Sequence, residues 1–420
     1  MKGHYSIAAS LMIIAMSLSL TTGISADATM GQNTGKSVIL LIGDGMGYAQ
    51  LTAARIEKSG ENLSVYGNTS LNMDHLEYDG YVATYSANSW VTDSAAAVTA
   101  MATGQKGNND VLSQDATSVW KEKNGKNLTT IAEMAKNAGM STGIVSTTRI
   151  THATPAGFYA HINDRDVEDE IANQLLDSEM DVVLGGGLKF FVAKNQTTLL
   201  GGSGKRADNK TLLGEFEARG YTLVYNDTAL EAINANNTSK VLGLFNNDHM
   251  SYELQRINQT RPEPSLANMT AKALKILSRN PKGFFIMVEG GRIDHAAHAR
   301  SYDNMTMDTL AFDEAVKVAM DFALANNNTL VMVTADHECG GAVLGAKDPD
   351  DYTAGMVPVF GSGLAEVHAD RYNLTATGKE ATHSAVDVPI MAMGPGADNI
   401  THGMIDNTEI FDISRSALGL

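Results

Sequence analysis

Short runs of valine, isoleucine and leucine recur along this chain, and each run ends in glycine or in polar residues. Six such runs cover residues 37–42, 143–146, 181–184, 283–288, 329–334 and 388–392. Strands that are buried on both faces of a parallel sheet have this composition. Between the runs, residues 128–138, 167–176 and 266–277 place apolar side chains at helical spacing. The alternation predicts an α/β fold, with a large, doubly wound, mostly parallel central sheet flanked by helices.

The first 28 residues have the pattern of a signal peptide. Lys2 gives a basic start, residues 7–20 are apolar, and residues 26–28 (Ala-Asp-Ala) resemble a cleavage site. An N-terminal membrane anchor is the alternative, although the apolar run is short for a membrane span. We expect cleavage, export to the periplasm, cell surface or medium, and no stable membrane insertion of the mature chain.

Residues 29–420 are expected to form a single domain. Within it, residues 189–260 differ from the remainder, because Gly201, Gly202 and Gly204 lie close together and the apolar periodicity is weak. Clustered glycines of this kind are typical of loops. We therefore interpret residues 189–260 as a surface excursion from the sheet.

The formal net charge is −17 at pH 7. An acidic surface argues against nucleic acid as a partner, whereas an anionic substrate would need a local cationic site such as bound metal ions. Cys339 is the single cysteine, so no internal disulfide can form.

Asn-X-Ser/Thr sites are frequent, which fits a glycosylated surface protein or simply an Asn- and Thr-rich composition. These sites include those that begin at Asn62, Asn68, Asn127, Asn195, Asn209, Asn226, Asn258, Asn268, Asn304, Asn327, Asn373 and Asn399.

Carboxylates and imidazoles gather where the predicted strands end, which is the edge at which open α/β sheets bind ligands. Asp294 and His298 are four residues apart, so one helical face presents both side chains. A carboxylate and an imidazole at this spacing suit zinc. Each residue taken alone also fits a turn, a helix cap or a structural histidine. The residues at the strand ends are Asp44, Glu289, Asp294, His298, Asp336 and His337, and His383 precedes the predicted strand at residues 388–392.

Ser94 is the candidate nucleophile. It precedes a run of alanines that favours a helix, so its hydroxyl is expected at a helix N-terminus, where backbone N–H groups attract phosphate. Taken alone, Ser94 would be a helix N-cap, and a cap and a nucleophile are not exclusive. Arg165 carries a guanidinium that can hold two phosphate oxygens, with a plain surface arginine as the alternative.

Together these residues resemble those of the alkaline phosphatases. The matching stretches follow the order of that family and cover residues 43–47, 92–104, 152–165, 289–298, 334–337 and 383–395. The resemblance implies hydrolysis of phosphate monoesters to an alcohol and inorganic phosphate through a phosphoserine at Ser94, with Arg165 holding the phosphate. It also implies that residues 29–420 are an alkaline phosphatase-like catalytic domain and that the protein is a homodimer.

The resemblance further implies two zinc ions and one magnesium ion, with the two zinc ions able to clamp the attacking and leaving oxygens. The first zinc site would use Asp294, His298 and His383. The second would use Asp44, Asp336 and His337, with the Ser94 oxygen completing it. The magnesium site would use Asp44, Thr154 and Glu289. Asp93, His152 and His295 would lie around these sites.

The chain departs from the best-known bacterial pattern at two positions. His152 and His295 stand where that enzyme has aspartate and lysine, as they do in animal and some microbial relatives. A neutral imidazole at position 152 should hold the third cation less firmly than a carboxylate would. Phe245 and Glu263 match the context of the calcium site of the animal enzymes, but Asn246 replaces a carboxylate there.

Two other classes of function remain open. A phosphodiesterase, sulfatase or phosphomutase shares the two-metal core, but residues 92–95 do not form a sulfatase motif, and Thr154, Arg165 and Glu289 favour monoesters. A non-enzymatic exported protein that binds metal or phosphate would not need Ser94. That serine is present together with every matched ligand.

Overall fold

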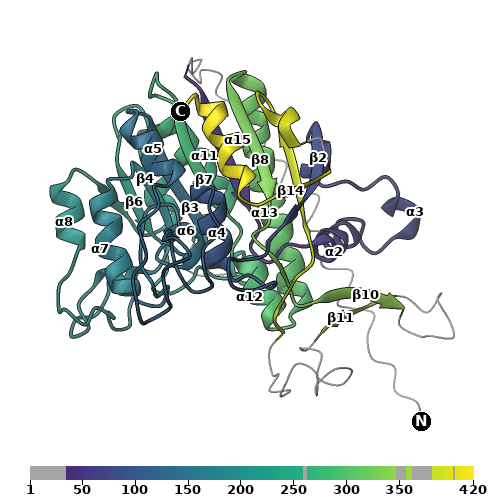
Figure 1. Cartoon of the computed structure of the whole chain (residues 1–420), viewed down its shortest axis with the longest axis horizontal. Helices are drawn as coiled ribbons and strands as arrows, with labels where there is room; N and C mark the ends of the chain where they lie inside the picture. Colours follow the sequence, from purple (N-terminus) through teal and green to yellow (C-terminus); the bar gives the residue numbers. More distant parts are fainter. Residues whose placement is uncertain (1–34, 259–262, 347–355, 362–380, 401–402) are drawn as a thin grey trace, which may run out of the picture. The chain divides into compact units, whose positions relative to one another are not determined.

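The core of the computed structural model is a ten-stranded sheet (Figure 1). Residues 35–258, 263–346, 356–361, 381–400 and 403–420 are described by the structure. The order of strands across the sheet is β14-β2-β13-β8-β1-β7-β3-β4-β6-β5. The strands are β1 (Ser37–Ile42), β2 (Tyr78–Ala83), β3 (Ser141–Arg149), β4 (Val182–Gly186), β5 (Thr222–Val224), β6 (Val241–Leu244), β7 (Phe284–Glu289), β8 (Thr329–Thr334), β13 (Val388–Met393) and β14 (Met404–Asp406).

Seven neighbouring strands, from β8 across to β5, run parallel to one another. All six predicted apolar runs lie in strands of this sheet, which confirms the predicted fold class. The predicted parallel direction of the strand at residues 388–392 was wrong, because this strand, β13, pairs antiparallel with both β8 and β2. An apolar run reports burial on both faces, and it does not report the direction in which the strand runs.

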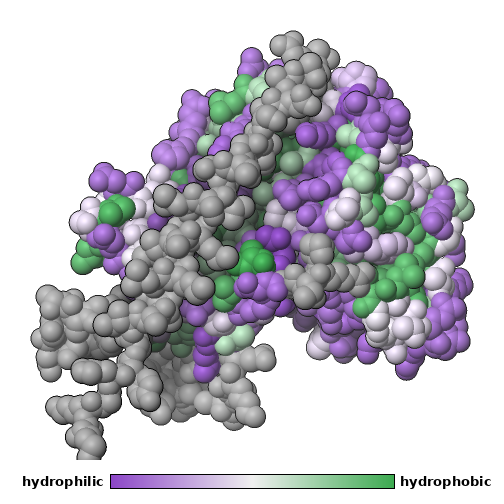
Figure 2. All heavy atoms as spheres, turned by 180° about the vertical axis from the view of Figure 1, so that it is seen from behind, coloured by the Kyte–Doolittle hydropathy of each residue, from purple (hydrophilic) through white to green (hydrophobic). Residues whose placement is uncertain are grey.

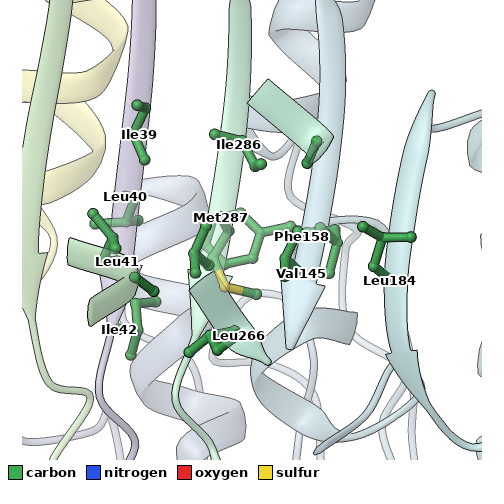
Figure 3. Packing of buried hydrophobic residues seen from close by; sticks show 14 of the residues in the cluster. Ile39, Leu40, Leu41, Ile42, Val145, Phe158, Leu184, Leu266, Ile286 and Met287 are labelled. Carbon is green, nitrogen blue, oxygen red and sulfur yellow. The ribbon is translucent and has the colours of Figure 1, made fainter. Parts of the chain in front are cut away.

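The three central strands are buried along their whole length and are mostly apolar. Every residue of β1, β7 and β8 is buried. Figure 3 shows Ile39 and Leu40 of β1 beside Ile286 and Met287 of β7, with Val145 of β3 next to them. Because these strands are held by hydrogen bonds on both sides and by packing on both faces, their ends form a rigid platform.

Helices cover both faces of the sheet (Figure 1). One set consists of α2, α11 and α13, which pack together and onto β3, β4 and β8; the other consists of α4, α5 and α15, which pack together and onto β1, β3 and β7. The helices are α2 (Tyr48–Lys58), α3 (Leu63–Tyr66), α4 (Ser94–Thr103), α5 (Ile131–Asn137), α6 (Ala153–Ala156), α7 (Glu168–Ser178), α8 (Leu213–Ala218), α9 (Asp227–Glu231), α10 (Glu253–Arg256), α11 (Leu266–Leu277), α12 (Arg292–His298), α13 (Tyr302–Ala325) and α15 (Glu409–Leu418).

The start of α5 differs from the predicted helix at residues 128–138. The helix begins at Ile131, because Thr130 and Glu133 form a reciprocal capping box just before it. The Thr130 hydroxyl accepts the Glu133 backbone N–H, and the Glu133 carboxylate accepts the Thr130 N–H. Two backbone donors of the first turn are thereby satisfied, which fixes the start of the helix at this point.

Residues 189–260 are more than a surface excursion, which corrects the sequence interpretation. They contain β5 and β6, which form one edge of the central sheet, as well as α8 and α9. These strands are only three and four residues long, so their sequence gives a weak signal. The described residues from 35 to 420 fall in one compact unit, residues 32–420.

Two short sheets lie outside the central one. The strand β9 (Glu338–Cys339) pairs antiparallel with β12 (His383–Ser384), and β10 (Ala342–Ala346) pairs with β11 (Met356–Phe360). None of the helices in the described ranges is long and apolar enough to cross a membrane. On the face shown in Figure 2, hydrophilic residues cover much of the coloured surface, with hydrophobic residues between them.

Candidate metal centre and active site

The carboxyl ends of three central strands bring acidic side chains to one place. Ile42 at the end of β1 is level with Glu289 of β7 on one side and with Thr334 of β8 on the other. Asp44 follows β1 by two residues, and Asp336 follows β8 by two residues. The parallel register of the sheet therefore places three carboxylates at the same edge, as the sequence predicted.

The first group of ligand atoms consists of Asp44, Asp336 and His337, which are all fully buried. The Nε2 atom of His337 lies 3.2 Å from Asp336 Oδ2 and 3.6 Å from Asp44 Oδ1. The backbone N–H of Gly45 donates to the other oxygen of Asp336 at 3.1 Å. We call these three residues the buried group.

Ser94 points at the buried group. It is the first residue of α4, and its Oγ lies 3.2 Å from His337 Nε2. The cap of this helix is Asp93 and not Ser94, because Asp93 Oδ1 accepts the Ala96 N–H at 2.9 Å. The alternative of a capping role for Ser94 was therefore wrong, and its hydroxyl faces the ligand atoms.

A second group consists of Asp294, His298 and His383, joined by Cys339. Asp294 and His298 share one face of α12, as their spacing predicted, and His298 Nε2 lies 3.4 Å from Asp294 Oδ2. His383 Nε2 lies 3.5 Å from Asp294 Oδ1 and 3.1 Å from His298 Nε2.

The other ring nitrogens of the two histidines bond to backbone carbonyls, with His298 Nδ1 2.5 Å from Ala381 O and His383 Nδ1 2.9 Å from Thr92 O. Such bonds fix the tautomer and aim Nε2 at a common point. We call Asp294, His298 and His383 the open group, because His298 is 30% exposed and His383 is 15% exposed.

A third group consists of Asp44, His152 and Glu289. Glu289 Oε2 accepts hydrogen bonds from the hydroxyls of Ser146 and Thr148. Thr154, on α6, is fully buried and lies beside Glu289. The family resemblance implied Asp44, Thr154 and Glu289 as ligands here with His152 nearby, and the structure brings a ring nitrogen of His152 into the same group as Asp44 and Glu289.

Arg165 reaches the site between Asp93 and His152. Its NH1 atom donates to Asp93 Oδ2 at 2.8 Å, and its NH2 atom lies 3.1 Å from His152 Nε2. A guanidinium can only donate, so His152 accepts through Nε2 and carries its proton on Nδ1. Asp93 is thus placed to hold the orientation of Arg165.

His249 is a member of the site that sequence analysis missed. Its ring centroid lies 4.2 Å from that of His295 and 5.3 Å from that of His152. Arg292 NH1 lies 2.8 Å from His295 Nδ1, which orients that ring. Burial is the main cause that lowers the pKa of all three imidazoles, to about 4 for His295. The only available sequence signal was the position of His249 shortly after the apolar residues 241–244.

The buried oxygens of these groups lack sufficient donors within the described residues. Atoms without a hydrogen-bond partner include Asp44 Oδ1 and Oδ2, Thr154 Oγ1, Glu289 Oε1, Asp294 Oδ1 and Asp336 Oδ2. Burial, reinforced by Asp336, raises the pKa of Asp44 well above its usual range, and burial raises the pKa of Glu289 to about 7. Unpaired buried carboxylates are costly unless a cation compensates them. The donor set therefore fits bound metal ions, with nitrogen and oxygen donors in two groups and mainly oxygen donors in the third.

The residues considered for calcium contact each other. Asn246 Nδ2 donates to Glu263 Oε1 at 2.6 Å, and the Ser251 N–H donates to Glu263 Oε2 at 2.8 Å. Both oxygens of this carboxylate are therefore already bonded to protein donors. The amide at position 246 brings no negative charge to this site.

Comparisons with known proteins identify the family. The sequence model of the alkaline phosphatase family matches residues 35–362. The alkaline phosphatase of Gadus morhua is 33% identical over 91% of each chain, and alkaline phosphatase 4 of Bacillus subtilis is 33% identical over 95% of this chain and 94% of that protein. The solved structure of alkaline phosphatase from the Antarctic bacterium TAB5 superimposes with a TM-score of 0.74 at 30% identity, covering 92% of this chain and 99% of that one.

These matches span the sheet, its flanking helices and most of the strand-end residues, and they agree with the metal-binding chemistry of the site. The matches therefore argue against the alternative of a non-enzymatic protein that only binds metal or phosphate. The chain belongs to the alkaline phosphatase family and is a metal-dependent hydrolase of phosphate monoesters.

Proposed function

We propose that the reaction proceeds through a phosphoserine at Ser94, with two zinc ions and one magnesium ion. The observation that carries this proposal is the position of the Ser94 hydroxyl, 3.2 Å from His337 and at the N-terminus of α4. The backbone N–H groups of this helix end offer donors to an anionic group. A nucleophile and a phosphate-binding helix end thus coincide at one residue.

The three groups divide into two kinds of metal site. The open group (Asp294, His298 and His383) and the buried group (Asp44, Asp336 and His337) would each hold zinc, which prefers imidazole and carboxylate donors. Asp44, Thr154 and Glu289 supply only oxygen, which suits magnesium. When bound, the ions supply positive charge that activates hydroxyl nucleophiles and stabilises the leaving oxygen.

The residues of the chain would act in two displacements. In the first, Ser94 Oγ forms a bond to phosphorus, the ester bond breaks and the alcohol leaves with a proton. In the second, water attacks the same phosphorus, the Ser94–phosphate bond breaks and the hydroxyl regains its proton. Arg165, held by Asp93 at 2.8 Å, would grip two phosphate oxygens throughout.

The same contacts favour monoesters over diesters. A monoester presents three terminal oxygens, which matches the bidentate Arg165, the α4 N-terminus and the cation sites together. A diester carries a second carbon substituent on one of these oxygens. The physiological substrate is not specified by contacts that involve only the phosphate.

We further propose that residues 1–28 are a cleaved signal peptide, that residues 29–420 form one catalytic domain, and that the protein is exported and glycosylated. A homodimer is the proposed assembly. Support for association comes from the β14–β2 edge of the sheet, where the directly paired residues Tyr81 and Met404 are both exposed. Neighbouring exposed apolar side chains are a feature of protein interfaces.

The test compares p-nitrophenyl phosphate with bis-p-nitrophenyl phosphate as substrates in the presence of zinc and magnesium. We expect rapid hydrolysis of the monoester and little hydrolysis of the diester. Ser94→Ala should remove most of the monoester activity while the metal content stays near that of the wild type. A preference for the diester, or full activity in Ser94→Ala, would reject the proposal.

A further inference from the structure

Cys339, the only cysteine of the chain, lies inside the open group. Its sulfur and one ligand atom each from Asp294, His298 and His383 are all within 4.8 Å of one another. The side chain is fully buried. No step of the proposed reaction uses this thiol.

The backbone explains why the thiol points at the metal ligands. Cys339 and His383 are direct partners in the antiparallel ladder of β9 and β12. Side chains of directly opposed residues lie on the same face, with Cβ atoms about 4.5–5.5 Å apart. The ladder therefore directs the sulfur and the His383 ring to the same side.

Two hydrogen bonds to its backbone hold Cys339 in this position. Its N–H donates to Gly45 O at 3.1 Å, and its carbonyl accepts Gln50 Nε2 at 2.7 Å. Gly45 adopts a φ of +72°, and a Cβ atom there would lie 2.8 Å from Cys339 Cβ and 2.9 Å from Asp294 Cα. The absence of a side chain at Gly45 is what allows Cys339 and Asp294 to approach each other.

A second observation points to a ligand in this space. Asp294 is buried, and its Oδ1 atom has no hydrogen-bond partner within the described residues. The Cys339 sulfur lies 3.7 Å from the Asp294 backbone oxygen, which is only a weak contact. The thiol and the carboxylate oxygen are thus both close to the two imidazoles and poorly satisfied by the protein.

We propose that Cys339 is a fourth protein ligand of the metal ion held by Asp294, His298 and His383. On binding, the thiol releases its proton to solvent, and the thiolate and carboxylate together offset a divalent charge while both histidines bind as neutral rings. Four such donors fill a tetrahedral shell, and catalytic zinc can expand to five ligands when phosphate arrives. A thiolate also makes this site softer than the buried group, so it should favour zinc, cobalt or cadmium over magnesium.

This inference rests on the proposed function, because it takes the open group to be a metal site. The test loads the metal-free full-length protein with Co²⁺ alone and records its absorption spectrum. We expect a near-ultraviolet sulfur-to-cobalt charge-transfer band in the wild type, in addition to the weaker visible bands of cobalt bound to nitrogen and oxygen. Because the chain has one cysteine, such a band has a single assignment.

Two variants complete the design. Cys339→Ser should lose the charge-transfer band and retain the visible cobalt bands. It should also bind zinc more weakly. Loss of a residue that only hydrogen-bonds to a metal ligand costs roughly 10–100-fold in affinity, so loss of a ligand should cost at least as much. In the background of Cys339→Ser, Ser414→Cys restores a buried thiol in α15, outside the metal groups, and should not restore the band. X-ray absorption of the zinc-loaded wild type needs no variant and should contain a zinc–sulfur distance of about 2.3 Å.

The outcomes separate the role of Cys339 as a ligand from the existence of a metal site at the open group. Visible cobalt bands without a charge-transfer band, and a zinc spectrum without sulfur, would overturn the role of Cys339 while leaving the open group as a metal site. Failure of the wild type to bind cobalt at the open group would overturn both this inference and the proposed metal centre. A charge-transfer band that is present in the wild type and absent both from Cys339→Ser and from the double variant with Ser414→Cys supports the inference, and a band restored by Ser414→Cys would overturn it.

Discussion

The buried group and the open group perform related tasks but are built in different ways. Asp44 and Asp336 follow adjacent strands of a rigid sheet and are completely enclosed. The open group joins one turn of α12 to a two-residue ladder, and its histidines are partly exposed. Ser94, the proposed nucleophile, contacts the buried group through His337. In the proposed reaction, the rigid buried group would therefore support the attacking hydroxyl, and the more exposed open group would lie on the side where leaving groups of different sizes depart.

Complete metal removal should have the largest effect, and its time course should separate the two groups. We expect a strong chelator to abolish activity and to lower the melting temperature, because ions that bind only the folded state stabilise it. Activity should fall before the melting temperature does, since the open group is accessible and the buried group is not. Metal content, activity and melting are measured on the same samples, and zinc and then magnesium are added back. Full activity and an unchanged melting temperature after verified removal would contradict this account.

The difference between the groups also explains what the sequence could predict. The buried group follows from apolar runs that end in acidic residues, because parallel strands bring their carboxyl ends together. Asp294 and His298 follow from helical spacing. His383 was assigned by resemblance, since its approach to α12 depends on a pairing between residues far apart in the chain.

The parts that escaped prediction share a physical cause. Cys339 and His249 each stand outside any periodic pattern, and only tertiary contacts bring them to the site. The strands β2, β5, β6 and β14 were missed because they are short or partly exposed and lie toward the sheet edges. Edge strands need apolar residues on fewer sides, so their sequences carry less signal.

Asp44 and Asp294 offer a direct comparison of the two groups. Asp44 belongs to two of the three ligand groups and Asp294 to one. Asp44→Asn should therefore lose two metal ions per chain, whereas Asp294→Asn should lose one. We expect both variants to reduce kcat. Removal of one group that stabilises charge in the transition state typically lowers kcat by roughly 10²–10³-fold. Metal content measured by mass spectrometry checks this, and equal losses in both variants would show that Asp44 is not shared.

The histidines beside the third group should have a smaller effect that depends on magnesium. His152→Asp adds a carboxylate near Asp44 and Glu289 and should tighten magnesium binding about tenfold or more. His295→Lys should tighten phosphate and slow turnover if product release limits the rate. Magnesium titration of activity and phosphate inhibition constants measure these effects.

An exposed histidine supplies the control for these variants. His75→Asp makes the same chemical change as His152→Asp but lies outside the metal groups. It should leave the magnesium dependence as in the wild type. A wild type that needs no added divalent ion, together with unchanged magnesium affinity in His152→Asp, would remove His152 from the third site.

A buried carboxylate outside the metal groups should have the smallest effect on activity, and its effect on stability isolates burial from metal binding. Burial, only partly offset by the bond from the Glu253 N–H, raises the pKa of Asp308 to about 8. Between about pH 4 and pH 8 the folded state holds a proton that the unfolded state has lost, so stability falls as the pH rises, by up to about 1.4 kcal/mol per unit. Asp308→Asn removes this dependence and should be more stable than the wild type at pH 9 but not at pH 4. Urea unfolding at both pH values tests this, and parallel pH profiles for the two proteins would contradict it.

The most direct test of the account is the identity of the phosphorylated residue. The enzyme is mixed with a phosphate monoester, quenched in acid within the turnover time and digested, and the phosphopeptides are identified by mass spectrometry. The account predicts one phosphate on the peptide that contains Ser94, and none in Ser94→Ala. Phosphate on another residue, or a Ser94→Ala variant that retains the wild-type kcat, would contradict it.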